Sequence, residues 1–403
     1  MNESIVIVGA GQAGAELAAA LRAGGFKGAL TLLGAESAPP YQRPPLSKKY
    51  LLGEIGAERL WLHDPAFYRD NAIALRPDAQ AVAIDRTARR VTLSTGEALP
   101  YDRLALTTGA RPRALPAAIG GALSGVHVVR TLADADAMAP AFRPGARALI
   151  VGGGYIGLEA AAVAARLGLH VTLIEAAPRI LGRVACAETA AWFRALHARH
   201  GVTVREGTAL ARLEGDPRVA RAVLADGETL EIDLAIVGIG VDPETALAAQ
   251  AGLTLDNGIA VDAGCATSDP VIFAAGDCAS FPWRGRRIRL ESVQNAIDQA
   301  KAAAAAMLGA PVAYDPTPWF WSDQYDVKLQ IAGLNAGYDR VIERPGARAG
   351  AHSVWYFKGA ALLAVDAMND ARAYMTAKRW LEAGVSPDAA RIADPACDLR
   401  DAA

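Results

Sequence analysis

Two stretches of the chain repeat one another, VGAGQAGAELA at residues 8–18 and VGGGYIGLEAA at residues 151–161. Each follows a short aliphatic run, opens an alanine-rich segment and carries three glycines in the spacing Gly-x-Gly-x-x-Gly. In a strand–turn–helix unit the first glycine permits a tight turn and the second lets the backbone approach a pyrophosphate. The third lets helix and strand pack closely, and the helix N-terminus faces the phosphate charge. The repetition therefore predicts two dinucleotide-binding units.

The first copy predicts a complete βαβ unit. Residues 4–9 favour a buried parallel strand, a helix runs to about Arg22, and residues 29–36 favour a second strand that ends at Glu36. Glu36 lies 22 residues after the last glycine, where a carboxylate can accept hydrogen bonds from a ribose. The glycines of this copy are Gly9, Gly11 and Gly14.

The second copy repeats each of these features. A strand precedes the glycines, the helix ends at Gly168, and the next strand carries Glu175, 18 residues after the last glycine. One such motif is weak support for a dinucleotide site, but two copies with complete βαβ context are strong support. The glycines of this copy are Gly152, Gly154 and Gly157.

The duplication extends beyond the glycines. YDRLALTTGARP at residues 101–112 and IDLAIVGIGVDP at residues 232–243 align without a gap, and each follows a β-hairpin signal, VTLSTGEAL or AVLADGETL. Each unit is therefore expected to contain a βαβ element, an antiparallel meander and a return strand. A protein that holds two dinucleotides usually passes electrons between them.

Two further segments complete the predicted fold. Residues 269–280 favour a strand that ends at Gly276 and Asp277, and residues 290–309 favour a long helix. Because they follow the second copy, we expect the second domain to be inserted into the first. From about Pro318, alternating segments indicate a small antiparallel sheet covered by a helix that closes at Gly384.

The predicted fold class is α/β, with two Rossmann-like dinucleotide-binding domains, the second inserted in the first, and a C-terminal α+β domain with an antiparallel sheet. The predicted boundaries are 1–112 with 242–317 for the first domain, 113–241 for the second and 318–403 for the third.

Composition narrows the class of protein. The chain has 403 residues, a net charge of -2, and 52% apolar residues, which favours a multidomain globular protein and gives no general attraction to nucleic acid. No run reaches the ~20 apolar residues of a membrane span, and the N-terminus resembles a first strand rather than a signal peptide. We therefore expect a cytoplasmic protein. Its four well-separated cysteines are expected to be reduced and buried.

Several motifs together resemble a known family. They are VGAGQAGAE, YQRPPLSKKYL, TTGARPR, VGGGYIGLE, AAGDCA, ESVQNAIDQA and PWFWSDQYDVKLQIAGL, and they cover the chain nearly end to end. The set resembles the FAD-dependent NAD(P)H:ferredoxin reductases of bacterial oxygenase systems, of the putidaredoxin reductase and aromatic-ring dioxygenase reductase types. That resemblance implies that the first fingerprint holds FAD and the second holds the nicotinamide nucleotide.

The resemblance also implies which residues contact the cofactors. Those expected at FAD are Gly9, Gly11, Gly14, Glu36, Arg43, Lys48, Val82, Thr108, Gly109, Arg111, Arg130, Gly276, Asp277, Ser292, Val293 and Trp319. Those expected at the nicotinamide nucleotide are Gly152, Gly154, Tyr155, Ile156, Gly157, Glu159, Glu175, Arg183, Gly238, Ile239 and Gly240.

The acid of the second copy indicates the nicotinamide preference. Glu175 would meet the adenosine ribose, where a 2′-phosphate would face a like charge, and no arginine follows it until Arg179. NADH is therefore favoured over NADPH, although Arg183 can still contact a phosphate.

Catalytic roles are expected for Lys48, Glu159, Trp319 and Trp321. A cation such as Lys48 near the flavin ring would favour its reduced anionic form. Glu159 is either an acid near the nicotinamide and flavin or an ordinary acid in the first turn of a helix, where Glu16 has the same position in the first copy. Trp319 and Trp321 should point the same way on a strand, and which of them contacts the flavin stays open.

The absence of a thiol pair separates this chain from disulfide reductases. Residues 39–51, PPYQRPPLSKKYL, place prolines and a leucine where those enzymes have cysteines, and no His-Pro pair follows. Single-cysteine NADH oxidases and peroxidases lose support for the same reason.

Electrons are expected to leave through a separate protein. No iron–sulfur, haem or zinc spacing occurs, so no metal site is expected in this chain. The predicted acceptor is a two-iron, two-sulfur ferredoxin that serves an oxygenase, docked on Arg284, Arg286, Arg287 and Arg289, which otherwise form a solvated charge run. The alternatives are a rubredoxin reductase or another NADH:acceptor flavoprotein, and a slow-turnover binding protein of the apoptosis-inducing-factor type. A monomer and a weak dimer both remain open.

Overall fold

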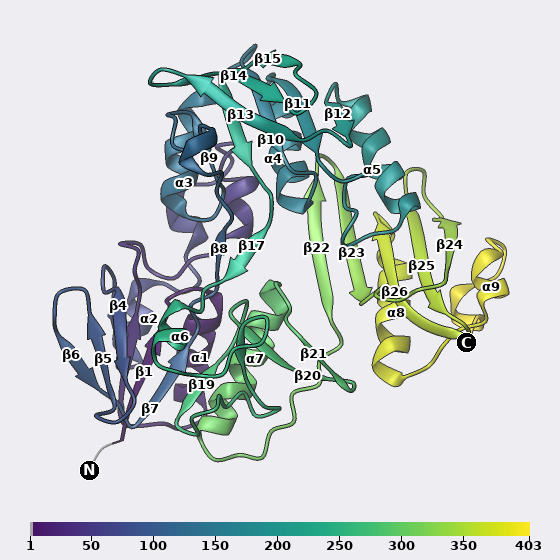
Figure 1. Cartoon of the computed structure of the whole chain (residues 1–403). Coiled ribbons are helices and arrows are strands. Elements are labelled where there is room, and N and C mark those ends of the chain that lie inside the picture. Colours follow the sequence, from purple (N-terminus) through teal and green to yellow (C-terminus); the bar gives the residue numbers. More distant parts are fainter. Residues whose placement is uncertain (1–2) are drawn as a thin grey trace. The chain divides into compact units, whose positions relative to one another are not determined.

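A computed structural model describes residues 3–403 as two compact units (Figure 1). Unit 1 consists of residues 1–42, 57–111 and 242–316. Unit 2 consists of residues 43–56, 112–241 and 317–403. The chain therefore passes back and forth between the units and ends in unit 2, so each unit is built from three segments distant in sequence.

The core of unit 1 is a five-stranded parallel sheet in the order β19-β7-β1-β2-β3. Its strands are β1 (Ser4–Val8), β2 (Ala29–Leu33), β3 (Ile73–Arg76), β7 (Arg103–Leu106) and β19 (Ile272–Ala274). The helices α1 (Gln12–Ala23) and α7 (Val293–Met307) pack against one another, and both bury alanine side chains, with leucines added in α1. Short residues allow that close approach, which explains the alanine-rich sequence of both helices.

Smaller elements surround this sheet. The meander consists of β4 (Ala81–Asp85), β5 (Arg90–Leu93) and β6 (Ala98–Pro100), as the hairpin signal predicts. A second small sheet contains β18 (Ile259–Ala260), β20 (Ala279–Trp283) and β21 (Arg286–Ile288). The short helices are η2 (Ala57–Leu60), α2 (Pro65–Asp70) and α6 (Ala246–Gln250). The strands β8 (Ala110–Pro112) and β17 (Val241–Pro243), where the chain crosses between units, pair with each other.

Unit 2 repeats the same parallel architecture in the order β12-β11-β10-β16-β9. Its strands are β9 (Val126–His127), β10 (Arg147–Val151), β11 (His170–Glu175), β12 (Thr203–Glu206) and β16 (Leu234–Val237). Its helices are η1 (Pro44–Ser47), η3 (Ala117–Ile119), α3 (Leu132–Met138), η4 (Ala139–Ala141), α4 (Tyr155–Arg166) and α5 (Ala187–Arg199). A meander of β13 (Leu210–Gly215), β14 (Val219–Leu224) and β15 (Thr229–Glu231) completes the duplication.

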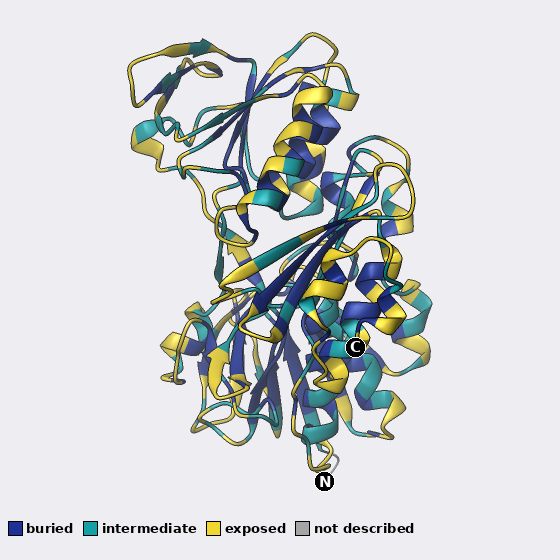
Figure 2. Cartoon of the chain, turned by 90° about the vertical axis from the view of Figure 1, so that its right-hand side faces the viewer, coloured by how far each residue is buried: buried dark blue, intermediate teal, exposed yellow. Residues whose placement is uncertain are grey.

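Unit 2 also contains a five-stranded antiparallel sheet in the order β22-β23-β26-β25-β24. Its strands are β22 (Trp319–Gln324), β23 (Val327–Gly333), β24 (Arg340–Pro345), β25 (His352–Lys358) and β26 (Ala361–Met368). The helices α8 (Ala371–Ala383), α9 (Ala389–Ala393) and η5 (Leu399–Asp401) follow it, and α8 ends at Gly384 in the left-handed conformation. One apolar cluster joins α4 and α5 to β23, β25 and β26 of this sheet. Figure 2 shows the inner strands of the sheet largely in dark blue, the colour of buried residues.

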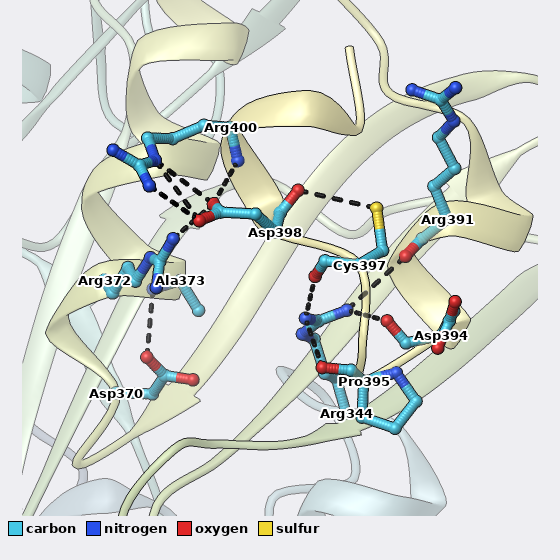
Figure 3. A network of polar contacts seen from close by, with 10 residues as sticks. All are labelled: Arg344, Asp370, Arg372, Ala373, Arg391, Asp394, Pro395, Cys397, Asp398 and Arg400. Atoms are coloured by element: carbon cyan, nitrogen blue, oxygen red, sulfur yellow. Dashed lines mark hydrogen bonds and ion pairs between the residues drawn. The ribbon is translucent and has the colours of Figure 1, made fainter.

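Arg344 fastens the C-terminal segment to this sheet. Its side chain is 7% exposed, and its Nη1 donates to the carbonyl oxygens of Ile392 at 2.8 Å and Asp394 at 2.7 Å. Its Nη2 donates to the carbonyl oxygen of Cys397 at 2.6 Å, so the planar guanidinium group hydrogen-bonds to several carbonyl oxygens at once (Figure 3). These bonds fix the segment after α9 without a disulfide.

The predicted fold class is confirmed, with one local correction. The second strand of the first copy ends at Leu33, so Glu36 lies in the following loop rather than at the strand end. At the residue after the strand, Gly34, a methyl group would lie 2.9 Å from the Cβ of Ala10, so this position requires glycine, which has a low strand propensity. In the second copy Glu175 is the last residue of β11, as predicted.

Candidate dinucleotide and redox sites

The glycines of the first copy form a cradle in unit 1. Gly9 has φ +113°, and a methyl group on it would lie 2.3 Å from the carbonyl oxygen of Thr107. A methyl group on Gly14 would lie 1.9 Å from the carbonyl oxygen of Gly9, so helix α1 and strand β1 meet only because both residues lack a side chain. At Gly11 nothing lies within 4 Å of that position, which leaves open space above the backbone.

The second copy builds the same cradle in unit 2. Gly152 has φ +107°, and a methyl group on it would lie 2.4 Å from the carbonyl oxygen of Gly238. The equivalent distance at Gly157 is 2.0 Å, to the carbonyl oxygen of Gly152. The middle glycine, Gly154, again has nothing within 4 Å. Tight contacts at the outer glycines and open space at the middle one are what a bound pyrophosphate requires.

Both helices that follow the cradles begin without a capping side chain. Gly11 and Gly154 are the N-cap residues of α1 and α4, neither makes a side-chain cap, and neither first turn contains an acid. The first N–H groups of each helix and its dipole are therefore oriented toward an anion at the open glycine. The residues present fit two dinucleotides, one in each unit.

The two acids differ in their surroundings. The Glu175 Oε2 accepts from the N–H of Gly153 at 2.7 Å, and its Oε1 accepts from the N–H of Ala177 at 2.7 Å. These bonds fix the carboxylate at the carboxyl end of β11, beside the cradle. In unit 1 the Glu36 carboxylate accepts from the hydroxyl of Tyr41.

The other FAD residues expected in unit 1 lie at the ends of its strands. The Thr108 hydroxyl donates to the carbonyl oxygen of Glu244 at 2.6 Å, and Gly109 has φ +72°. Gly276 has φ +84°, and a methyl group there would lie 3.0 Å from the Cβ of Ala13 in the first turn of α1. Thr108, Gly276 and the glycine cradle are thus brought to the same edge of the sheet, with Asp277 next in the chain.

The other residues of unit 1 that were predicted to contact FAD lie on a helix N-terminus, in an ion pair and on an exposed strand. Ser292 is the N-cap of α7 and accepts from the N–H of Asn295 at 3.1 Å, and Val293 is the first residue of that helix. Arg111 pairs with Glu244 at 3.3 Å. Val82 lies on β4 with 41% of its surface exposed.

Two apolar side chains of unit 2 are exposed beside its cradle. Ile156, in the first turn of α4, is 43% exposed, and Ile239, after β16, is 37% exposed. A methyl group on Gly240 would lie 3.6 Å from the Arg183 Nη2 and 4.0 Å from the Arg113 Nη1. Arg113 was not among the predicted site residues, although it is the last residue of the quoted TTGARPR motif.

Lys48 and Glu159, both predicted as catalytic, form a buried ion pair in unit 2. The Lys48 Nζ lies 2.6 Å from the Glu159 Oε2, and Glu159, on α4, is 2% exposed. Glu159 lies beyond the first turn of α4, so the alternative of an ordinary first-turn acid does not apply, and its role near the cofactors stays a prediction. Because burial of a charge is unfavourable unless it is paired and hydrogen-bonded, this pair indicates a specific role for the two residues.

Two serines complete the hydrogen bonding of Glu159, and sequence analysis missed both. The Ser47 hydroxyl donates to the Oε2 at 2.9 Å, and the Ser322 hydroxyl donates to the Oε1 at 2.7 Å. They come from the quoted PPLSKK and PWFWSDQ motifs, in which the adjacent lysine and tryptophans drew attention. Strand alternation provides a signal for Ser322, because it predicts that this residue faces away from the two tryptophans.

Other predicted residues of unit 2 are also brought together. The Arg43 Nη1 donates to the carbonyl oxygen of Arg130 at 2.8 Å. On β22 the rings of Trp319 and Trp321 lie 5.7 Å apart, which confirms that they share one face. On the other face Phe320 packs on Tyr155 with ring centroids 4.8 Å apart.

The arginine run in unit 1 divides into two pairs. The Arg287 Nη1 donates to the carbonyl oxygens of Val261 and Ser280, and Arg289 pairs with Glu291 at 2.5 Å. The guanidinium groups of Arg284 and Arg286 instead lie over the ring of Trp283, at 4.8 and 5.2 Å, and both residues are exposed.

The cysteines show no sign of redox activity within residues 3–403. Burial raises the pKa of Cys265 to about 12 and also raises the pKa of Cys186 and Cys278, so these thiols stay protonated at neutral pH. Cys397 is only partly buried, which departs from the expectation for all four.

In the same described part of the chain, no group of His, Cys, Asp or Glu side chains is arranged to hold a metal ion. No described helix is both long and apolar enough to span a bilayer.

Comparison with known proteins agrees with this geometry. Residues 3–300 match the family described as pyridine nucleotide-disulphide oxidoreductase. The chain belongs to this family. Residues 319–403 match the domain described as reductase C-terminal. The family accounts for a flavin and a pyridine nucleotide as cofactors.

Individual relatives cover almost the whole chain. Putidaredoxin reductase of Pseudomonas putida is 44% identical over 91% of this chain and 89% of its own length. The ferredoxin–NAD(+) reductase component of the biphenyl dioxygenase system of Paraburkholderia xenovorans is 38% identical over 100% and 98%. A crystal structure of a covalent putidaredoxin reductase–putidaredoxin complex matches with a TM-score of 0.96 and 41% identity, over 99% of this chain and 98% of that one.

Proposed function

We propose that this protein is an FAD-dependent NADH:ferredoxin oxidoreductase that supplies electrons to an oxygenase, either a haem monooxygenase or a Rieske dioxygenase. The observation that carries the proposal is the pair of equivalent glycine cradles together with the buried Lys48–Glu159 ion pair. The names of the relatives support it, because they are reductases of ferredoxin-dependent oxygenase systems. In this proposal the protein acts in the cytoplasm, where NADH is produced.

The first cradle is proposed to hold FAD, in a domain of residues 1–112 and 242–317. The second is proposed to hold NADH, in a domain of residues 113–241. Bound in the first cradle, FAD would supply the chemistry of accepting a hydride from NADH and of releasing the two electrons one at a time. The protein contributes binding, orientation and charge. The backbone N–H groups of α1 and α4 bind the two pyrophosphates, and the side chains at the strand ends orient them.

Lys48 and Glu159 are proposed to act at the reacting rings. A fixed cation stabilises negative charge that develops nearby, and Lys48 is held in place by Glu159 and by the carbonyl oxygen of Pro44 at 3.3 Å. Glu159 in turn is fixed by hydroxyl groups on both of its oxygens. Trp319 and Trp321 are proposed to shield the flavin and to assist the exit of electrons, and either can be the one in contact.

Glu175 is proposed to favour NADH over NADPH. Its carboxylate is tied to the N–H groups of Gly153 and Ala177, so it cannot turn away from an added phosphate without breaking both bonds. A 2′-phosphate would then meet a fixed like charge. Arg183, near Gly240, is proposed to bind the nucleotide without reversing this preference.

Ferredoxin is proposed to dock on Arg284 and Arg286. These two arginines are exposed, whereas Arg287 holds backbone carbonyls of its own unit. Charge reversal at Arg284 and Arg286 should weaken ferredoxin reduction by about tenfold at low salt and leave ferricyanide reduction unchanged. A matched control reverses Arg89 and Arg90, which are exposed on the β4–β5 turn. Equal loss in both assays would contradict docking at this pair.

The decisive experiment measures NADH-driven cytochrome c reduction by the FAD-loaded protein, with and without an acidic two-iron, two-sulfur ferredoxin. A large increase on adding ferredoxin supports the proposal. Suppose that NADH reduces the flavin rapidly, but that cytochrome c reduction increases only with rubredoxin and not with any ferredoxin. The acceptor would then be a rubredoxin rather than a ferredoxin. Slow flavin reduction that leaves a long-lived charge-transfer complex would overturn the enzyme assignment in favour of a binding protein.

A further inference from the structure

A continuous series of hydrogen bonds in unit 2 begins at Glu159. The Ser322 hydroxyl donates to the Glu159 Oε1 at 2.7 Å, and the Gln324 Nε2 lies 3.3 Å from the Ser322 Oγ. The Gln324 Oε1 lies 2.8 Å from the His197 Nε2. The His197 Nδ1 lies 3.2 Å from the hydroxyl of Tyr325. The series therefore joins α4, β22, α5 and the turn after β22.

The interior members of this series are buried, and the series ends near the surface. Ser322 and His197 are 0% exposed and Gln324 is 1% exposed. Tyr325 is half-buried, and its ring stacks on the exposed His200 with centroids 3.6 Å apart. A buried polar series of this length is unfavourable unless every member has a partner, and each of these members has one.

The direction of every bond follows from its two ends. An amide nitrogen can only donate, so Gln324 donates to Ser322 and its Oε1 must accept from His197. His197 therefore carries its proton on Nε2. Burial lowers the pKa of His197 to about 4, so the ring is neutral at pH 7 and its Nδ1 accepts from Tyr325. All four bonds thus point toward Glu159.

We propose that Tyr325, His197, Gln324 and Ser322 form a positioning chain that fixes the Glu159 carboxylate toward Lys48 at the reaction site. Bonds aligned in one direction polarise one another, so the final hydroxyl is a stronger donor than an isolated serine. A donor of this kind stabilises the charged form of the acid. This proposal rests on the proposed function in one respect, namely that Glu159 lies at the site of flavin reduction.

Other charged groups do not replace this chain. Lys48 is the cation bound to Glu159, and Ser47 provides the second hydroxyl. The charged side chains on the strands that pack against α4 are engaged elsewhere or exposed. Arg147 pairs with Asp233, and Asp323 pairs with Lys328. Glu175 accepts from the N–H groups of Gly153 and Ala177, and His170 is exposed at the start of β11. At the other end, the ring of His200 faces Tyr325, and its Nδ1 bonds the carbonyl oxygen of Leu196 at 2.9 Å.

The first test needs no turnover. In the FAD-loaded full-length protein, nitrogen-15 NMR should show one histidine as the neutral Nε2–H tautomer that stays neutral on titration down to about pH 4. Its signal should be absent in His197→Gln. A neutral Nδ1–H tautomer, or protonation near pH 6.5, would overturn the chain whatever the protein's function.

The second test concerns the pH profile of flavin reduction by NADH in stopped flow. Ser322→Ala removes the last donor, so the acid limb should move toward higher pH by about one unit. Ser322→Thr restores a hydroxyl and should restore the profile. Tyr325→Phe, at the far end, should move the limb in the same direction by less.

A matched control separates positioning from packing. Ser353 is an equally buried serine of the same sheet, bonded to Trp355 rather than to this chain, so Ser353→Ala should leave the pH profile unmoved. If Ser322→Ala lowers the rate equally at every pH, the chain is structural only and the proposal fails. If NADH does not reduce the wild-type flavin, the proposed function fails, while the tautomer measurement still decides the chain.

Discussion

The two cradles can be compared position by position. A methyl group on Gly14 would approach the carbonyl oxygen of Gly9 to 1.9 Å, and one on Gly157 would approach that of Gly152 to 2.0 Å. The middle glycines, Gly11 and Gly154, are both open. Where backbone meets backbone, the two units are nearly identical.

The units differ at the acids that are proposed to reach the ligand. Glu175 ends β11 and is bound by two N–H groups, whereas Glu36 lies three residues beyond β2 and is bound by the Tyr41 hydroxyl. The backbone geometry fits what all dinucleotides share, the pyrophosphate. In the proposed function, the acid and its surroundings distinguish one dinucleotide from another.

The largest effect on stability is expected from substitutions at Gly14 and Gly157, the third glycines of the two cradles. Gly14→Ala and Gly157→Ala each force a methyl group into a backbone carbonyl, so each should lower the free energy of unfolding by about 2–3 kcal/mol. Urea unfolding followed by tryptophan fluorescence, with FAD in excess, measures this. If one variant were stable and the other not, the two cradles would not be structurally equivalent.

The middle glycines should separate the two cofactors. Gly154→Ala places a methyl group where the pyrophosphate of NADH is proposed to lie, so KM for NADH should rise about tenfold, or about 1.4 kcal/mol, with FAD retained. Gly11→Ala should instead weaken FAD retention, measured by flavin fluorescence after gel filtration. Each variant is the control for the other, and loss of FAD from Gly154→Ala would reverse the assignment of the cradles.

A smaller effect is expected at the acids. Glu175→Ala removes the fixed charge, so KM for NADH should rise and the preference for NADH over NADPH should fall by about tenfold. Steady-state kinetics with both nucleotides measures the ratio. Glu36→Ala is the matched control and should change FAD retention but not the ratio. An unchanged ratio in Glu175→Ala would assign Glu175 to folding alone, through Gly153 and Ala177.

Sequence analysis predicted best what depends on local chemistry. The glycine spacing, the alanine-rich helices and the hairpin signals each require particular residues at particular positions, and the strands and helices formed where these patterns occur. The strand before Glu36 was predicted three residues too long: its aliphatic residues end at Leu33, where β2 ends, and Gly34 follows.

Contacts between distant segments could not be predicted in the same way. Lys48 and Glu159 are 111 residues apart, and Ser322 is another 163 residues beyond Glu159, so no local pattern links them. Ser292 shows a related difficulty: the family resemblance implies a cofactor contact, which stays a prediction, and its hydroxyl also caps α7. A polar residue next to a helix has two uses that look alike in sequence.

The smallest effect is expected at Asp102 and Asp233, which lie at equivalent positions in the two repeats. Asp102 accepts from the N–H and hydroxyl of Ser4, and Asp233 accepts from the N–H and guanidinium of Arg147. The backbone bond from Ser4 lowers the pKa of Asp102, and the side-chain bond from Arg147 lowers the pKa of Asp233. Each therefore stabilises the folded state fully above the unfolded pKa of about 3.9, and the contribution is lost as the pH falls through the lower folded value.

Replacing each acid by asparagine should accordingly lower the unfolding temperature at pH 7 by only about 1–2 °C, because both side chains are partly exposed. The difference from wild type should shrink as the pH falls below the unfolded pKa of about 3.9, and it should vanish once the pH lies below the lowered folded pKa. Added salt should reduce the Asp233→Asn effect more than the Asp102→Asn effect, since only Asp233 is paired with a charged group. Equal salt dependence would mean that Arg147 contributes little, and that the two repeats use this position in the same way after all.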